Sequence, residues 1–358
     1  MPLNRDRIDR VITHMKAEGL SQIIVTATAS VYYLTGLWVE PMERMLALLL
    51  REDGSATLFG NTMFGLPETL EIPIVLHRDG ENPVEGLAAA LQEGPVGIDK
   101  FWYSKFLLGL MALRRDILPV EGSGPVDLAR KCKDEKEQAA IRHSSRMNDE
   151  VMAQAIAALH EGVRENALVG LINREHLSRG ADQEGPQLVA FGPNGADPHH
   201  AVDGTVLKSG DSVILDMFTP NGRYWCDMTR TVFYKTVNEK QREVYELVRR
   251  ANAAAIAEAR PGVPLSHLDA TARGVIEEGG YGSYFTHRLG HGCGLDCHEP
   301  PDVSGSSHGL LEPGMVFSVE PGIYLPGEFG VRIEDLVLVT ETGCEVLNHY
   351  PKDLQVIE

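Results

Sequence analysis

The chain has 358 residues, of which 43% are hydrophobic and 23% charged, a composition typical of globular proteins. Its formal net charge of −18 argues against a nucleic-acid backbone or an anionic membrane as partner. No apolar run approaches the roughly 20 residues of a membrane span, and the charged N-terminal segment lacks the apolar core of a signal peptide. Five cysteines without framework spacing are typical of a reducing compartment, so we expect a cytoplasmic protein.

The first third of the chain alternates helical and strand-like patterns. Apolar residues at helical spacing predict a first helix over residues 8–20, and apolar runs with turn signals predict the strands that follow it. In chain order we expect strands at 23–27, 45–50, 56–60 and 72–77, a helix at 83–92, a strand at 96–99 and a helix at 103–115. This alternation predicts an N-terminal α/β domain over residues 1–125.

The remaining residues, 126–358, are expected to form a second domain. Gly, Pro and then a dense charge run over 121–138 predict a linker that enters a long helix ending near His160. Further on we expect a helix at 165–179, a strand with a loop at 185–201, and helices at 238–259 and 264–278. The order helix, helix, hairpin then occurs twice, which indicates an α+β domain built by internal duplication.

A hairpin is predicted between Asp211 and Arg230, where Asn221-Gly222 separates two strand-like runs. A two-residue loop at these positions places Asp216 opposite Asp227, and facing acids repel each other. The alternatives are a solvated edge hairpin, which tolerates such a pair, and a metal site, which uses it.

A second hairpin around Pro326-Gly327-Glu328 places Glu320 opposite Glu334 in the same way. With His291 in the glycine-rich segment GHGCG, the chain offers four carboxylates and one imidazole. Such oxygen-rich sets favour manganese or a similar divalent ion, and five ligands suit two ions that share bridging carboxylates. By contrast, the spacing of Cys293, Cys297 and His298 fits no standard structural zinc pattern.

The segments DMF, CDMTRT, HRLGHGCGLDCHEPP, MVFSVEPGIYLPG and VRIEDLVLVTE resemble those of the pita-bread metallopeptidases, a family that includes methionine aminopeptidase, aminopeptidase P, prolidase and the metal-free creatinase. The resemblance implies a pita-bread fold with pseudo-twofold symmetry for the second domain. It also implies that Asp216 and Asp227 bind one divalent ion, that His291 and Glu320 bind the other, and that Asp227 and Glu334 bridge the two. Manganese is the expected metal, with cobalt or zinc as alternatives.

By the same resemblance, His199 and His298 are catalytic and substrate-binding histidines, with His200 as the alternative to His199. His287 and Arg332 occupy positions that bind substrate. The chain departs from the family at Met217 and Phe218, of which the second usually is glycine. Neither departure removes a ligand.

The implied reaction is peptide-bond hydrolysis by a metal-bridging hydroxide, with Glu320 as general base and His199 stabilising the oxyanion. The segments RIDRVITHMKAEGL and VYYLTGLWVEPMERMLALLL resemble the N-terminal domain of creatinases and Xaa-Pro peptidases. We therefore expect a homodimeric Xaa-Pro dipeptidase that acts on small peptides. The alternatives are an Xaa-Pro aminopeptidase, a metal-free hydrolase like creatinase, and a binding protein without activity.

Overall fold

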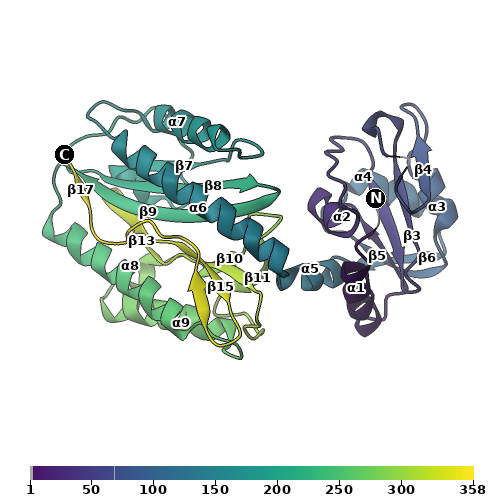
Figure 1. Ribbon diagram of the computed structural model, residues 1–358. Helices are drawn as coiled ribbons and strands as arrows, with labels where there is room; N and C mark the ends of the chain where they lie inside the picture. The colour runs from purple at the N-terminus through teal and green to yellow at the C-terminus, as the bar shows by residue number, and fades with distance from the viewer. Residues whose placement is uncertain (1–2, 68) are drawn as a thin grey trace. The chain divides into compact units, whose positions relative to one another are not determined.

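The computed structural model describes residues 3–67 and 69–358. The chain forms two compact units, Met1–Arg130 and Lys131–Glu358. Within the described residues, no helix combines the length and the apolar character needed to cross a bilayer. Figure 1 labels the helices and strands of both units.

The first unit is built around a mixed six-stranded sheet with the order β4-β3-β2-β1-β5-β6. Ile24, Leu49, Phe59 and Val96, from four neighbouring strands, share one buried cluster with residues of the helices. In chain order the elements are α1 (Arg5–Ala17), β1 (Gln22–Val25), α2 (Thr28–Thr35), β2 (Ala47–Arg51), β3 (Ala56–Asn61), η1 (Thr62–Phe64), β4 (Ile74–His77), α3 (Glu85–Ala90), β5 (Gly94–Ile98), α4 (Ser104–Leu113), β6 (Ile117–Glu121) and α5 (Gly124–Lys131).

Each helix and strand predicted for this unit is present, with ends that shift by a few residues. The sequence patterns missed α2 and the edge strand β6. The linker predicted over 121–138 is wrong for its central part, because residues 124–131 form helix α5. Asp134 and Glu137 then make a capping box that starts the next helix, α6, so the charge run is the N-terminus of a helix.

The second unit has three sheets, with the orders β17-β9-β8-β7, β11-β10-β12-β15-β16 and β13-β14. Its strands lie between two helix pairs, α6 with α7 and α8 with α9 (Figure 1). The elements are α6 (Glu135–Ala157), α7 (Glu165–Ser178), β7 (Leu188–Phe191), η2 (Gly192–Ala196), β8 (Ser212–Asn221), β9 (Tyr224–Tyr234), α8 (Glu239–Glu258), α9 (Leu265–Glu278), η3 (Gly282–Tyr284), β10 (Gly290–Gly292), β11 (Glu299–Val303), β12 (Val316–Val319), β13 (Gly322–Leu325), β14 (Phe329–Arg332), β15 (Asp335–Val339), β16 (Cys344–Val346) and β17 (Val356–Ile357).

Local features repeat in the two halves of this unit and support the predicted duplication. Helices α6 and α8 both start with a capping box, Asp134 with Glu137 and Asn238 with Gln241. Each helix pair covers its own buried cluster, one under α6 and α7 and the other under α8 and α9. A single bridge residue precedes the second helix of each pair, Arg164 in one half and Pro264 in the other. The two halves therefore share one architecture.

The predicted register of the first acidic hairpin is wrong. Strand β8 pairs with β9 so that Asp216 faces Thr229 and Asp227 faces Phe218. The turn residues are Gly222 and Arg223, both with positive φ, and not Asn221-Gly222. Because the shift in pairing amounts to two residues, both aspartates stay on one face of the sheet, as diagonal neighbours.

The predicted register of the second acidic hairpin is confirmed on both sides of the glutamates. Gly322 pairs with Arg332 in the short ladder of β13 and β14, and Val319 pairs with Asp335 in the ladder of β12 and β15. Glu320 and Glu334 lie in the gap between these ladders, where both strands are interrupted. The two carboxylates therefore come from opposing breaks in the strands, and their backbones are free of the regular pleat.

Candidate metal centre

A cavity of about 690 Å³ in the second unit collects every site residue that the sequence singled out. Its lining combines acids, histidines and an arginine from both halves of the duplication: His199, His200, Asp216, Asp227, His287, His291, His298, Glu320, Arg332 and Glu334. Phe218, Arg288 and Cys297 also line it and had no predicted role in the site. The cavity is large enough for a small peptide.

The carboxylates form two groups that share one member. Asp216, Asp227 and Glu334 each offer a ligand atom within 4.8 Å of the others, and so do His291, Glu320 and Glu334. Both groups have the donor chemistry and spacing of a divalent metal site, and Glu334 belongs to each. Two neighbouring ions that share a carboxylate need ligands in such an arrangement.

The burial of the site carboxylates favours cations beside them. Asp227 and Glu334 are 3% and 2% exposed, and Oδ1 of both Asp216 and Asp227 is buried without a hydrogen-bond partner among the described residues. Burial, reinforced by the neighbouring carboxylates, raises the pKa of Asp227 and of Glu334 well above the ordinary range. Because an uncompensated buried charge is costly, these residues fit divalent ions well.

His291 presents one nitrogen to the acids. Its Nδ1 lies 3.1 Å from the carbonyl oxygen of Gly292, and its Nε2 lies 3.3 Å from Glu320 Oε1. Burial lowers the pKa of His291 to about 3, so the ring is neutral near pH 7. A neutral ring that donates through Nδ1 leaves the Nε2 lone pair free for a metal, and the backbone carbonyl fixes the orientation of the ring.

Arg332 is held against the acids. Its Nη2 donates to Asp216 Oδ2 at 2.7 Å, its Nη1 donates to the hydroxyl of Tyr324 at 2.9 Å, and its Nε donates to Thr229 Oγ1 at 3.1 Å. The Tyr324 hydroxyl also lies 2.8 Å from Nε2 of His287. The buried guanidinium of Arg332 therefore fixes Asp216, and the Tyr324 hydroxyl links this guanidinium to His287.

Thr229 and Tyr324 are site residues that sequence reasoning missed. Thr229 Oγ1 donates to Glu334 Oε2 at 2.7 Å, which ties the first hairpin to the second. Thr229 is the cross-strand partner of Asp216, so the correct register of the first hairpin would have identified it as a site residue. Tyr324 lies diagonally across from Arg332 in the second hairpin, whose register was already predictable.

The two adjacent histidines of the loop after β7 have different surroundings. Nε2 of His200 lies 2.8 Å from Glu165 Oε2, and that carboxylate is fully buried at the start of α7. His199 is exposed at the cavity lining, and among the residues that the structure describes its one hydrogen bond is from its backbone N–H to Asp197 Oδ1. The Glu165–His200 contact therefore anchors the loop, while the ring of His199 is available to a ligand.

Two family models match the chain. The model of metallopeptidase family M24 matches residues 139–341, and that of the creatinase/prolidase N-terminal domain matches residues 7–130. The chain belongs to metallopeptidase family M24.

Similar proteins extend this likeness over both units. A putative dipeptidase of Bacillus subtilis (strain 168) is 35% identical over 98% of this chain and 100% of its own. The crystal structure of a prolidase from Thermococcus sibiricus is 34% identical, covers 98% of each chain and has a TM-score of 0.93. A dipeptidase structure from Pyrococcus horikoshii is 32% identical, covers 98% of this chain and 99% of its own, and has a TM-score of 0.91.

These findings confirm the predicted fold class and the predicted metallopeptidase class of this M24 chain. Its two departures from the family pattern are also explained by their places in β8. Met217 is fully buried in the cluster under α6 and α7, whereas Phe218 faces Asp227 across the hairpin and lines the cavity. Only Phe218 therefore changes the shape of the site.

Proposed function

We propose that this M24 metallopeptidase is an Xaa-Pro dipeptidase that depends on two divalent ions. The observation that carries the proposal is the pair of ligand groups that share Glu334. Asp216 and Asp227 would hold one ion, His291 and Glu320 would hold the other, and Asp227 and Glu334 would contribute to both. Manganese is the proposed metal, because four of the five ligands are hard carboxylates.

The ions supply an activated water at neutral pH and charge stabilisation for the reacting carbonyl. Glu320 is the proposed general base, and burial raises the pKa of its carboxyl group to about 7, the range suited to accepting a proton at neutral pH. Its Oε1 accepts a hydrogen bond from Ser318 Oγ at 3.1 Å, which orients the carboxylate. The same carboxyl group then delivers the proton to the leaving nitrogen.

His199 and His298 are the proposed substrate-binding histidines, both exposed at the cavity lining. A ring donor at His199 would stabilise the oxyanion, and His298 would hold the part of the substrate after the scissile bond. His287 acts through Tyr324, and Arg332 through Asp216, so we assign both to positioning the site. The prediction that these two contact substrate directly stays a prediction.

The proposed substrate follows from the relatives and from the chemistry of the bond. An X-Pro bond has no amide N–H and a restricted geometry, so its hydrolysis favours a site that does not need that donor. A prolidase and dipeptidases match this chain over both units, including the N-terminal domain. We therefore favour the dipeptide Xaa-Pro over longer peptides.

The test compares Leu-Pro with the tripeptide Leu-Pro-Gly on the manganese-loaded protein. A dipeptidase releases proline from Leu-Pro and leaves the tripeptide nearly intact. Strong turnover of the tripeptide without cleavage of Leu-Pro would instead identify an Xaa-Pro aminopeptidase. Turnover of both that survives exhaustive chelation would refute the metal dependence.

We also propose a cytoplasmic homodimer. The five cysteines are free thiols, as suits a reducing compartment. Large apolar side chains are exposed on the first unit, among them Phe101, Leu108 and Leu118 at 60% or more. Such residues favour an interface between subunits. Light scattering of the protein and of Leu108→Glu tests this, and a monomeric parent protein would contradict it.

A further inference from the structure

Two buried asparagines occupy the same position in the two long helices of the second unit. Asn148 in α6 and Asn252 in α8 each lie 14 residues after the N-cap of the helix, which is Asp134 in one half and Asn238 in the other. Both asparagines are 0% exposed. Because asparagine is a weak helix former and a buried amide is costly without partners, its presence at both positions indicates a role for its hydrogen bonds.

The amide of Asn148 binds the strand that carries Asp216. Its Nδ2 donates to the carbonyl oxygen of Met217 at 2.7 Å. Met217 directly follows Asp216 in β8, and its side chain is fully buried under α6 and α7. The helix therefore holds the backbone of β8 at the residue next to a proposed metal ligand.

The amide of Asn252 makes the corresponding contacts in the second half, at the strand breaks that carry both glutamates. Its Nδ2 donates to the carbonyl oxygen of Val319 at 2.9 Å and, over a longer 3.5 Å, to that of Ile333. Val319 directly precedes Glu320, and Ile333 directly precedes Glu334. One side chain therefore connects the two breaks.

A second partner fixes the orientation of each amide. Nε2 of His176 lies 3.0 Å from Asn148 Oδ1, and Lys352 Nζ donates to Asn252 Oδ1 at 2.9 Å. A carbonyl oxygen can only accept and an ammonium group can only donate, so in both residues the NH₂ group must face the strand. Neither amide can flip without losing its hydrogen bonds.

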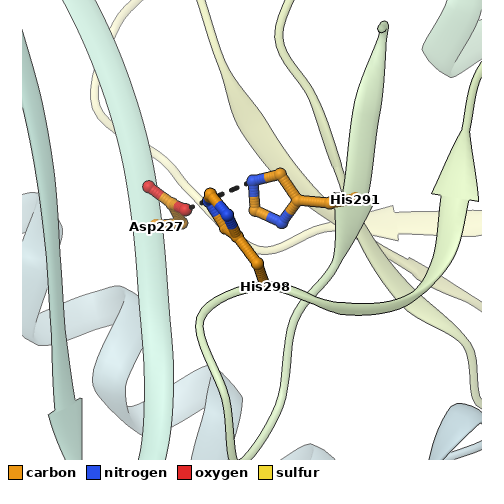
Figure 2. A group of neighbouring side chains, drawn as sticks. All are labelled: Asp227, His291 and His298. Carbon is orange, nitrogen blue, oxygen red and sulfur yellow. Dashed lines mark ion pairs between the residues drawn. The ribbon is translucent and has the colours of Figure 1, made fainter. Parts of the chain in front are cut away.

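The metal centre depends on the relative positions of strands from both halves. Figure 2 shows the carboxylate of Asp227, on β9, next to the rings of His291, on β10, and of His298. Nε2 of His291 lies 3.8 Å from Asp227 Oδ2. A binding site needs its groups held to within about 0.5 Å, yet Glu320 and Glu334 lie outside the strands. Contacts other than a regular ladder must therefore hold them.

We propose that Asn148 and Asn252 are positioning residues of the metal centre, one for each half. Asn148 holds the strand of Asp216, which belongs to one proposed ion. Asn252 holds the breaks of Glu320, which belongs to the other ion, and of Glu334, which belongs to both. The inference rests on the two-ion centre of the proposed function and is independent of the Xaa-Pro substrate.

The test titrates Mn²⁺ into the full-length protein after chelation and resolves the two affinities by calorimetry, under conditions in which urea unfolding shows each variant to be folded. Asn148→Leu removes the donor to β8 and should weaken the binding of one Mn²⁺ ion by about tenfold or more, with the other near the parent value. Asn252→Leu should weaken both ions, because Glu334 belongs to both ligand groups. Asn148→Ser and Asn252→Ser, whose hydroxyls are too short to replace the amide, should show the same pattern and serve where a leucine variant does not fold.

The matched control is Asn61→Leu. Asn61 is 1% exposed in β3 of the first unit, and its Nδ2 donates to Asp79 Oδ1 at 2.9 Å. This variant should lower the urea midpoint and leave both Mn²⁺ affinities at the parent value. It therefore separates a loss of stability from a loss of ligand positioning.

Unchanged Mn²⁺ affinities in Asn148→Leu and Asn252→Leu, or an equal loss of affinity in Asn61→Leu, would overturn the proposal. So would a loss of both affinities in Asn148→Leu as large as that in Asn252→Leu. A parent protein that binds fewer than two Mn²⁺ ions would remove the two-ion centre of the proposed function and this inference with it. Two ions bound alike by the parent protein and the variants would remove only this inference.

Discussion

Glu320→Gln should stabilise the metal-free protein, although it removes the proposed general base. Burial is the main cause that raises the pKa of Glu320 from 4.5 to about 7. An acid whose folded pKa is raised destabilises the fold when it is ionised, so stability falls as pH rises from 4.5 to about 7. The raised pKa of Glu320 therefore lowers the free energy of unfolding by about 3 kcal/mol at pH 8 and by about 1 kcal/mol at pH 5.

Glutamine carries no charge at either pH and keeps the oxygen that accepts from Ser318. In the presence of a chelator, we therefore expect Glu320→Gln to be the more stable protein by about 3 kcal/mol at pH 8 and about 1 kcal/mol at pH 5. In Mn²⁺ the order should reverse, because the parent protein gains a ligand–metal bond that the variant lacks.

Urea unfolding at both pH values, with chelator and with Mn²⁺, measures these differences. The exposed Glu278 at the end of α9 provides the control Glu278→Gln, which should show no such pH-dependent gain. A Glu320→Gln variant that is less stable than the parent at pH 8 in chelator would show that the buried Glu320 carboxylate does not destabilise the metal-free fold. So would a stability difference that is the same at pH 5 and pH 8.

Three further predictions concern the support of the site. Arg230 is 1% exposed and donates to Asp335 at 2.8 Å, so Arg230→Met should lower the free energy of unfolding by about 3–5 kcal/mol. An unchanged urea midpoint would contradict this prediction. Burial lowers the pKa of His176 to about 4, so the free energy of unfolding of the parent protein should fall by about 3 kcal/mol as pH falls from 6.5 to about 4. In acid titrations, His176→Gln should lose less stability over the same range. Glu165→Gln should loosen the loop that Glu165 anchors through His200, and it should lower kcat/KM by about tenfold or more at unchanged metal content. Kinetics equal to those of the parent protein would exclude a positioning role for the Glu165–His200 contact.

The sequence predicted the second acidic hairpin better than the first, for a physical reason. Gly327 has φ of 75°, and its place between strand-like runs fixes the turn locally. The turn of the first hairpin depends on distant residues. Asn221 Nδ2 donates to the carbonyl of Gly180, and the N–H of Arg223 donates to Asp182 Oδ2 at 2.6 Å, which supports a positive φ of 74° at Arg223.

The site was predictable where the ligands are charged and ordered along the chain, and unpredictable where a neutral side chain joins two elements. All five metal-ligand candidates line one cavity. Thr229 and Tyr324 carry no charge, and their roles depend on which residues the two hairpins bring opposite them. Cys297 was visible only as part of a zinc pattern that the spacing excluded, because its contact with Asp227 joins residues 70 positions apart.

The proposed metal-dependent dipeptidase activity is tested by the release of proline from Leu-Pro before chelation, after chelation and after Mn²⁺ is restored, with Asp227→Asn measured in parallel. We expect that chelation abolishes turnover, that Mn²⁺ restores it, and that Asp227→Asn shows neither turnover nor metal-dependent recovery. Undiminished proline release after chelation, or by Asp227→Asn, would contradict the claim that these buried carboxylates hold the ions of an Xaa-Pro dipeptidase.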